Sequence, residues 1–283
     1  MKRLNVEILS HEGEYVPCFG GVFALWLFIL WRYLMTLDKF FSENKKVALA
    51  FSGGVDSSYL MYAAKAANCD IHAYYVKAAF QPMFEFEDAK KLAKELNCPM
   101  TVIELDVLAN STVTANPKDR CYHCKKVIFG NIVRCAAEDG YTVLLDGSNA
   151  SDDAGDRPGM RATKELNVRS PLRESGLTKT EIRKLSKEAG LFTWDKPSYA
   201  CLATRIPTGE TITAEILGKV ESSEDFLMSN GYSDFRVRTL EGGRIAKIQL
   251  PENQFVRFIG EKNKVYTELK KYFAEIYLDL TAR

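Results

Sequence analysis

The sequence lacks several features that would place it in a common class of protein. Neither sign of charge is in excess, since 38 Lys and Arg residues stand against 37 Asp and Glu residues and the net charge is +1. A positive field over the whole chain, of the kind that attracts nucleic acid, is therefore absent, which leaves only a local basic patch for such binding. We find no internal repeat and no low-complexity segment, and the composition, 46% hydrophobic and 27% charged, excludes a disordered chain and a collagen.

Long hydrophobic runs are also scarce. The uncharged run over residues 15–31 is shorter than the roughly 20 apolar residues that a spanning helix needs, and a proline and two glycines interrupt it. It lacks the cationic start and the small-residue cleavage site of a signal peptide. A membrane anchor is the weaker interpretation. We favour an apolar N-terminal extension over 1–35 outside the main fold, or residues upstream of a start at Met35.

The seven cysteines are an odd number, and Cys121 and Cys124 are the one closely spaced pair. In a long, enzyme-like chain this pattern indicates a reducing compartment, where a close pair binds metal or does redox chemistry more often than it forms a bridge. We therefore expect a cytoplasmic protein. Its 283 residues suffice for one large domain or two smaller ones, and either can bury a core without metal or disulfide help.

From residue 47 onward, short apolar strands alternate with helical patterns. In chain order, the spacing predicts a strand at 47–51, a helix at 57–67, a strand at 71–76, a helix at 84–96, a strand at 100–105, a helix at 121–139 and a strand at 142–146. Strands separated by helices indicate an α/β fold with a parallel sheet and helices on both of its faces. Such a sheet binds ligands at the carboxyl ends of its strands.

The pattern changes after Pro207. Before it come a long loop with a short helix, over 149–172, and a helix over 178–189 that begins with a capping box. After it the sequence predicts a helix at 214–230, hairpin strands at 235–240 and 244–250, a helix at 263–273 and a strand at 275–280. We therefore predict a nucleotide-binding domain over 36–206 and a smaller α+β domain over 207–283.

The segment Ser52-Gly53-Gly54-Val55-Asp56-Ser57-Ser58 directly follows the first predicted strand and opens a helix. Paired glycines adopt backbone conformations closed to other residues, and free N–H groups at a helix start attract phosphate. Asp56 suits the magnesium ion that accompanies a nucleotide. The Walker and GxGxxG patterns are both absent. A tight turn with a serine cap is the alternative interpretation.

A second cluster of chemistry is formed by three cysteines, because Cys121-Tyr122-His123-Cys124 is a C-x-x-C motif and Cys201 lies in a polar loop. Three thiolates do not close a tetrahedral zinc site, and His123, flanked by ligands, would be a strained fourth. Three cysteines with one open position suit a [4Fe-4S] cluster whose free iron binds an extra sulfide. We expect the neighbouring bases to lower the thiol pKa values. The alternative is incidental thiols on a helix.

These motifs resemble those of a known family. The SGGVDSS segment is similar to the SGGxDS motif of PP-loop ATP pyrophosphatases, which marks a superfamily. The stretch from Asp146 to Ala162, which contains RPGMRA, together with PSYACLATRIP and Arg236-Val237-Arg238, resembles the LarE family. RPGMRA with ACLATRIP is close to diagnostic for that family, and the resemblance covers roughly residues 37–280.

The resemblance implies a PP-loop fold and an ATP-dependent sulfur transferase that helps to make the nickel-pincer nucleotide cofactor of lactate racemase. ATP with Mg²⁺ would adenylate a carboxylate of pyridinium-3,5-biscarboxylic acid mononucleotide, and a sulfur held by the enzyme would displace AMP to give a thiocarboxylate. The family divides over the sulfur source. Some members sacrifice the cysteine that matches Cys201, and others are thought to hold a [4Fe-4S] cluster on three cysteines. Cys121, Cys124 and Cys201 favour the cluster type here.

Residue roles follow from the same resemblance. The ATP phosphates and magnesium would be bound by Ser52, Gly53, Gly54, Asp56, Ser57 and Ser58. Arg236 and Arg238 would hold the substrate phosphate, with a solvated strand face as the alternative. Arg205 would bind substrate or stabilise developing charge, and Asp152 and Arg157 would line the nucleotide pocket. The partner would be a small-molecule nucleotide, with neither nucleic acid nor membrane, and the family implies a homo-oligomer.

Three other functions compete with this interpretation. A tRNA thiolase can combine a PP-loop with cluster cysteines, but it needs a polyanion footprint that the near-zero net charge disfavours. A PP-loop amidotransferase resembling NAD or GMP synthetases would leave the three cysteines without a role. A noncatalytic nucleotide-binding protein is disfavoured by the intact loop with Asp56.

Overall fold

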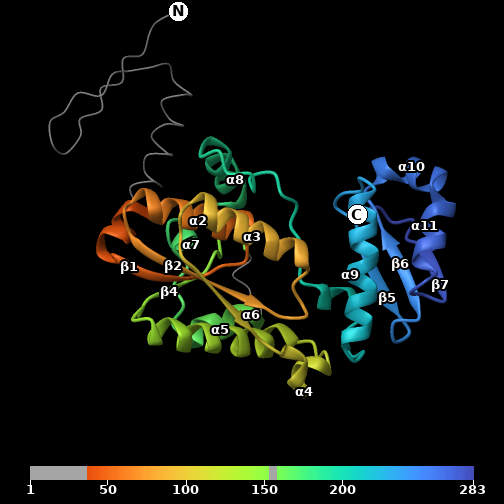
Figure 1. The fold of residues 1–283 in the computed structure, drawn as a ribbon, viewed down its shortest axis with the longest axis horizontal. Coiled ribbons are helices and arrows are strands. Elements are labelled where there is room, and N and C mark those ends of the chain that lie inside the picture. The colour runs from red at the N-terminus through yellow and green to blue at the C-terminus, as the bar shows by residue number, and fades with distance from the viewer. Residues whose placement is uncertain (1–36, 153–157) are drawn as a thin grey trace, which may run out of the picture.

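The computed structural model describes residues 37–152 and 158–283. The apolar N-terminal run and Arg157 lie outside these ranges, so the interpretations given to them above stay predictions. Within the described ranges, none of the helices has the length and apolar character needed to cross a membrane. Figure 1 shows a larger sheet flanked by helices and, beside it, a smaller sheet with helices of its own.

The larger sheet is parallel, as predicted. It contains β1 (Lys46–Ala50), β2 (Asp70–Lys77), β3 (Met100–Glu104) and β4 (Leu144–Leu145), in the order β3-β2-β1-β4. β1 pairs with β2 so that Ala50 lies opposite Tyr74, and β2 pairs with β3 so that Lys77 lies opposite Glu104. The carboxyl ends of these three strands therefore meet at one edge, next to the loop that follows β1.

Helices cover both faces of this sheet (Figure 1). On one face, α2 (Val55–Ala66) and α3 (Met83–Glu95) bury apolar residues of β1 and β2, among them Leu49 and Tyr75, and α3 contributes Leu92 to the same core. On the other face lie α5 (Arg120–Glu138) and α6 (Pro158–Glu165), and here α5 packs Phe129 and Ile132 against the sheet. The predicted α/β fold is therefore confirmed.

The segment that connects the two sheets contains short elements. In chain order the remaining elements before the second sheet are η1 (Val107–Ala109), α4 (Ser111–Thr114), α7 (Pro171–Glu174), α8 (Lys179–Glu188), η2 (Leu202–Arg205) and α9 (Ala214–Ser229). The capping box predicted at the start of α8 is present, because Thr178 Oγ1 accepts from Glu181 N and Glu181 Oε2 accepts from Thr178 N at 2.8 Å. This box fixes the direction in which Lys179 enters the helix.

The second sheet is mixed. β5 (Arg236–Leu240) and β6 (Ile245–Gln249) form the predicted antiparallel hairpin, and β7 (Glu275–Leu278) pairs with β6 in parallel. The last helices are η3 (Glu252–Gln254), α10 (Phe255–Gly260) and α11 (Lys262–Leu269). One face of the sheet packs Val237 and Ile248 into an apolar core. Arg236 and Arg238 alternate with Val237 along β5 and so lie on the opposite face.

Candidate active site

The loop between β1 and α2 is shaped by Gly53. This residue has a φ of +73°, and a Cβ built on it would lie 3.1 Å from Ala89 Cβ and 3.2 Å from the Glu85 carbonyl oxygen. Both the backbone angle and the contact with α3 therefore require glycine. Gly54 is the N-cap residue of α2 and has an ordinary φ of −78°. The first turn of α2 thus presents its backbone N–H groups to whatever lies in the loop.

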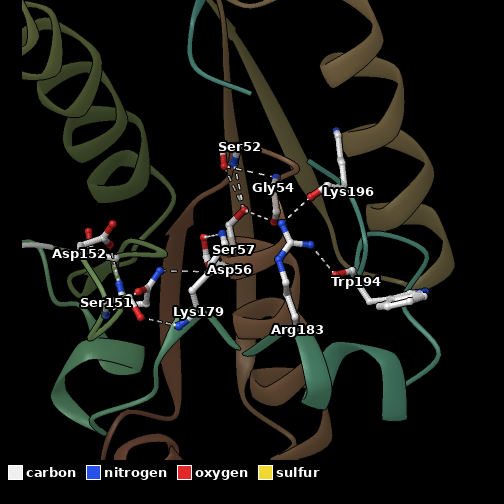
Figure 2. Close-up of polar contacts among 12 residues, drawn as sticks. Ser52, Gly54, Asp56, Ser57, Ser151, Asp152, Lys179, Arg183, Trp194 and Lys196 are labelled. Atoms are coloured by element: carbon white, nitrogen blue, oxygen red, sulfur yellow. Dashed lines mark hydrogen bonds and ion pairs between the residues drawn. The ribbon is translucent and has the colours of Figure 1, made fainter. Parts of the chain in front are cut away.

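Hydroxyl groups hold this loop in shape. Ser57 Oγ lies 3.2 Å from Ser52 Oγ and donates to the Gly54 carbonyl at 3.2 Å, as Figure 2 shows. Ser52 Oγ in turn accepts from Gly54 N at 3.4 Å. Ser58 is completely buried, and its Oγ has no hydrogen-bond partner among the described residues. The hydroxyls of Ser52 and Ser57 therefore lie at the loop, whereas that of Ser58 lies inside the protein.

Asp56 faces two partners that the sequence analysis did not identify. Its Oδ2 accepts from Lys179 Nζ at 2.5 Å, and its Oδ1 accepts from Asn149 Nδ2 at 3.3 Å (Figure 2). Lys179 is the first residue of α8 and is far from Asp56 in the chain, so no local pattern could have paired them. The Asp56 carboxylate suits Mg²⁺, whereas the Asn149 amide oxygen accepts from Ser151 N and faces away from Asp56. For Asp56 to bind the ion, Lys179 must first move away.

The loop that begins at Asp146 packs against the phosphate loop. A Cβ built on Gly147 would lie only 2.9 Å from Ser57 N, so the backbone at Gly147 approaches α2 closely. Asp152 Oδ2 accepts from Asn149 N at 2.9 Å and lies 3.8 Å from Arg173. The structure therefore connects Asp152 to Asp56 through Asn149. Arg157, predicted for the same pocket, is outside the described residues.

The three candidate cysteines come together from two segments. Cys121 is exposed in the first turn of α5, and Cys124 and Cys201 are partly buried against one apolar cluster that includes Phe80 and Leu202. They are near enough that, after burial, the neighbouring Cys201 and Cys121 thiols are the next causes that raise the pKa of Cys124. Arg120 Nη2 lies 3.8 Å from Cys121 Sγ. Thiols distant in sequence thus meet beside α5.

The expectation of lowered thiol pKa values is wrong for two of these cysteines. Burial raises the pKa of Cys124 to about 12 and also raises that of Cys201. Arg120 has the opposite effect on both, but burial outweighs it. Cys124 and Cys201 are therefore protonated in the ligand-free protein, and a metal or cluster would have to displace their protons on binding.

The donor set fits an iron–sulfur cluster better than a single ion. In residues 37–152 and 158–283, no three His, Cys, Asp or Glu side chains are placed to hold one metal ion. His123 Nε2 lies 3.2 Å from an Asp119 carboxylate oxygen. A cube of four irons spreads its ligands more widely than one ion does. The three thiols would provide soft ligands beside an apolar wall, and Arg120 next to them would provide a compensating charge.

Arg205 holds the cysteine loop in place. Only 1% of Arg205 is exposed, and its guanidinium pairs with both carboxylate oxygens of Glu224, at 2.8 and 3.0 Å. It also donates to the Ala200 carbonyl at 2.9 Å, directly before Cys201. Glu224 lies on α9 and also accepts from the Tyr199 hydroxyl. The guanidinium is thus fully engaged, and it fixes the backbone next to Cys201.

Arg236 and Arg238 extend toward the same loop from β5. Arg236 Nη2 donates to the Ser198 carbonyl at 2.6 Å, and Arg238 Nη1 donates to the Thr204 carbonyl at 2.8 Å. Burial and the neighbouring charge of Arg205 lower the pKa of Arg236 to about 10 and also lower that of Arg238. Such depressed values indicate an excess of positive charge, which an anionic ligand would relieve.

A cavity of about 600 Å³ opens at the carboxyl ends of β2 and β3. Its lining includes Tyr75, Lys77, Gln81, Phe86, Asp106 and Glu221. The Tyr75 hydroxyl and Gln81 Oε1 are buried and have no hydrogen-bond partner among the described residues. Because Ala50 lies opposite Tyr74 in the sheet, the cavity is one strand away from the phosphate loop.

Two comparisons with known proteins identify the family. Residues 39–174 match the family model described as asparagine synthase. Over 248 residues the chain is 32% identical to the pyridinium-3,5-bisthiocarboxylic acid mononucleotide synthase of Lactiplantibacillus plantarum, which covers 87% of this chain and 89% of the relative. The chain belongs to the LarE family.

Two further relatives match large parts of the chain. An uncharacterised protein of Synechocystis sp. is 37% identical over 80% of this chain and 84% of its own length. A tRNA-specific 2-thiouridylase of Pseudothermotoga lettingae is 28% identical over 58% of this chain and 57% of its own length. This LarE-family chain is an ATP-dependent sulfurtransferase with a PP-loop fold, as the sequence predicted.

Proposed function

We propose that the protein uses ATP to adenylate a carboxylate of pyridinium-3,5-biscarboxylic acid mononucleotide and replaces it with a thiocarboxylate, in the synthesis of the nickel-pincer nucleotide cofactor. The observation that carries the proposal is the 32% identity to a synthase of the bisthiocarboxylic acid product, over nearly the whole of both chains. The site supports it with a phosphate loop, a group of three thiols and a group of arginines.

The loop after β1 would hold the pyrophosphate that leaves. Its backbone N–H groups, with the hydroxyls of Ser52 and Ser57, would bind an anion at the start of α2. Asp56 would hold Mg²⁺, which when bound neutralises phosphate charge, and the Asn149 side-chain amide would orient the carboxylate. Lys179 would then be free to pair with a phosphate oxygen in place of Asp56. The neighbouring cavity has the size and the unpaired polar atoms to take the nucleoside of ATP.

The acceptor would bind on the side of β5. Arg236 and Arg238 lie on one strand face and carry an excess of positive charge, which suits the phosphate of a mononucleotide. For Arg205 we propose a positioning role in place of the substrate contact expected from the sequence, because Glu224 and the Ala200 carbonyl already pair with its guanidinium. Its proposed role is to position Cys201 beside the bound acceptor.

The sulfur source follows from the thiol set. Cys121, Cys124 and Cys201 would hold a [4Fe-4S] cluster, which when bound supplies a sulfide as the attacking sulfur. Arg120, 3.8 Å from Cys121 Sγ, would offset the negative charge of the thiolates. The competing mechanism uses the sulfur of Cys201 itself and leaves dehydroalanine at that position.

Anaerobic purification separates these mechanisms. We expect iron and acid-labile sulfide in the wild-type protein, and loss of both together with loss of thiocarboxylate formation in Cys121→Ala and Cys124→Ala. Cys135→Ala, on the same helix, should keep the cluster and the activity. If Cys121→Ala still forms one thiocarboxylate per chain while Cys201 becomes dehydroalanine, the cluster mechanism is wrong. If the wild type forms no AMP with the pyridinium mononucleotide, the function itself is wrong.

A further inference from the structure

Lys196 is a buried cation to which the function described above gives no role. It lies between α8 and Cys201, and only 15% of its side chain is exposed. Its Nζ atom is shielded from solvent and lies 2.7 Å from Asp88 Oδ2, yet it forms no well-aligned hydrogen bond among the described residues. A buried ammonium with unused donors costs free energy unless a ligand satisfies it.

The backbone of Lys196 is held firmly. Arg183, on α8, donates to the Trp194 carbonyl at 2.6 Å and to the Lys196 carbonyl at 2.7 Å. Figure 2 shows these two bonds and the Lys196 side chain, which points away from Arg183. The backbone is thus fixed to α8, whereas the Lys196 side chain reaches α3, where its Nζ lies against Asp88 and the Phe84 ring.

The contacts of α3 place the Lys196 ammonium near the loop that follows β1. The turn of α3 that pairs with Lys196 through Asp88 also contacts Gly53, through Glu85 and Ala89. Lys196 is also the cation with the largest effect on the pKa of Glu85. The Lys196 ammonium and the glycine pair of the loop therefore lie against the same turn of one helix.

The charges around Lys196 favour the transfer of its ammonium from Asp88 to an anionic ligand. Asp88 is partly open to solvent, and its pairing with Lys196 is therefore screened. Burial raises the pKa of Glu85 to about 7, so this second acid is only partly ionised near neutral pH. Lysine is a compact point charge with three rotatable donors, which suits a phosphate oxygen that arrives and leaves during a reaction.

We propose that Lys196 contacts the α-phosphate of ATP and stabilises the transition state of adenylation. The inference rests on the proposed function. The loop after β1 would hold the β- and γ-phosphates, and Lys196 lies between that loop and Cys201. A carboxylate oxygen of the acceptor forms a bond to the α-phosphorus, and the bond to pyrophosphate breaks with its electron pair leaving on pyrophosphate. Lys196 keeps its proton and offsets charge on the nonbridging oxygens.

Binding measurements test the contact without the acceptor. AMP carries the α-phosphate alone, and pyrophosphate stands for the other two. Lys196→Met should weaken AMP binding roughly 10-fold or more, the effect of losing a hydrogen bond to a charged group, and leave pyrophosphate binding nearly unchanged. Asp88→Asn breaks the same ion pair but keeps the ammonium, so its AMP binding should equal or exceed that of the wild type.

Turnover gives a second measurement. AMP formation should fall about 100-fold in Lys196→Met, the loss typical of one transition-state donor, and recover in part in Lys196→Arg. Lys187→Met is the matched control, because Lys187 stacks on the Trp194 ring in the same region and should keep its activity. Full AMP affinity in Lys196→Met, or equal losses in Lys196→Met and Asp88→Asn, would overturn the inference. A wild type inactive on the pyridinium mononucleotide would refute the function but leave the AMP comparison valid. If Lys196→Met unfolds at a markedly lower temperature than the wild type, the partial recovery of AMP formation expected in Lys196→Arg becomes the test.

Discussion

Some single residues have structural roles that cannot be inferred from their neighbours in the sequence, and Glu224 is an example. Glu224 is fully buried, pairs with Arg205, accepts from Tyr199 and accepts from the backbone N–H of Val237. It thereby joins α9, β5 and the cysteine loop. A carboxylate with so many partners tolerates burial, but its loss leaves a buried guanidinium without a counter-charge.

Glu224→Gln should therefore destabilise the protein by about 3 kcal/mol or more, which is typical of breaking a buried pair. Urea unfolding followed by circular dichroism measures this change. Glu215→Gln, on the same helix, breaks a pair between Lys219 and an exposed carboxylate and should leave the unfolding midpoint almost where it was. Equal midpoints for the two variants would show that the buried pair contributes little.

Residue roles could be predicted from the sequence only where the chemistry is local. The phosphate loop was recognisable because its glycines, serines and Asp56 are contiguous. Lys179 was not, since it is 123 residues from Asp56 and only the fold joins them. The role suggested for Arg205 overlooked Glu224 for the same reason. The prediction of lowered thiol pKa values was wrong because the sequence shows the adjacent basic residues but does not show burial.

Helices and strands hold the site residues in position, and the loop after β1 is held by its contact with α3. Gly53→Ala should lose the roughly 1–2 kcal/mol that a left-handed backbone costs a residue with a side chain, and more from the crowding against Ala89. Gly190→Ala is the matched control, because its φ of +70° is nearly the same as that of Gly53 and no atom lies within 4 Å of its added Cβ. Thermal melts of both, with ATP binding, separate the two effects. Identical losses would mean that the α3 contact is unimportant.

The capping box at the start of α8 lies directly before Lys179, which contacts Asp56. Thr178→Ala removes the capping box and should cost about 1 kcal/mol of stability. Because Lys179 follows directly, we also expect weaker ATP binding than the loss of stability alone explains. Thr213→Ala, which removes the N-cap of α9, is a comparable change away from the loop. ATP binding that is unaffected in Thr178→Ala would contradict a link between the cap and Lys179.

The predicted boundaries of helices agree with the structure where the hydrophobic pattern repeats over many residues. The predicted helices at 84–96 and 214–230 match α3 and α9 to within a residue at each end. The strand predicted at 142–146 shrinks to β4, because only Leu144 and Leu145 pair with β1. α4 and α10 escaped prediction, since helices of four and six residues show no clear period.

The molecule as a whole carries a titration that its stability should report. Burial raises the pKa of Glu85 from 4.5 to about 7. An acid whose pKa is higher in the folded state destabilises the fold as pH rises, here between about 4.5 and 7, because the unfolded chain ionises first. Glu85→Gln should therefore match the wild type at pH 4 and gain up to about 3 kcal/mol of stability above pH 7. Glu87→Gln, on the same helix, is the control, and parallel pH profiles for all three proteins would refute the shift.

The buried pair between Arg205 and Glu224 crosses the boundary that the sequence suggested near Pro207. A gene split at that boundary would separate a carboxylate from the only guanidinium hydrogen-bonded to it among the described residues, and each half would carry an orphaned interior ion. The halves would then recover solubility only on meeting each other. Co-expression of the two pieces should yield a stoichiometric complex, whereas each piece made alone should aggregate.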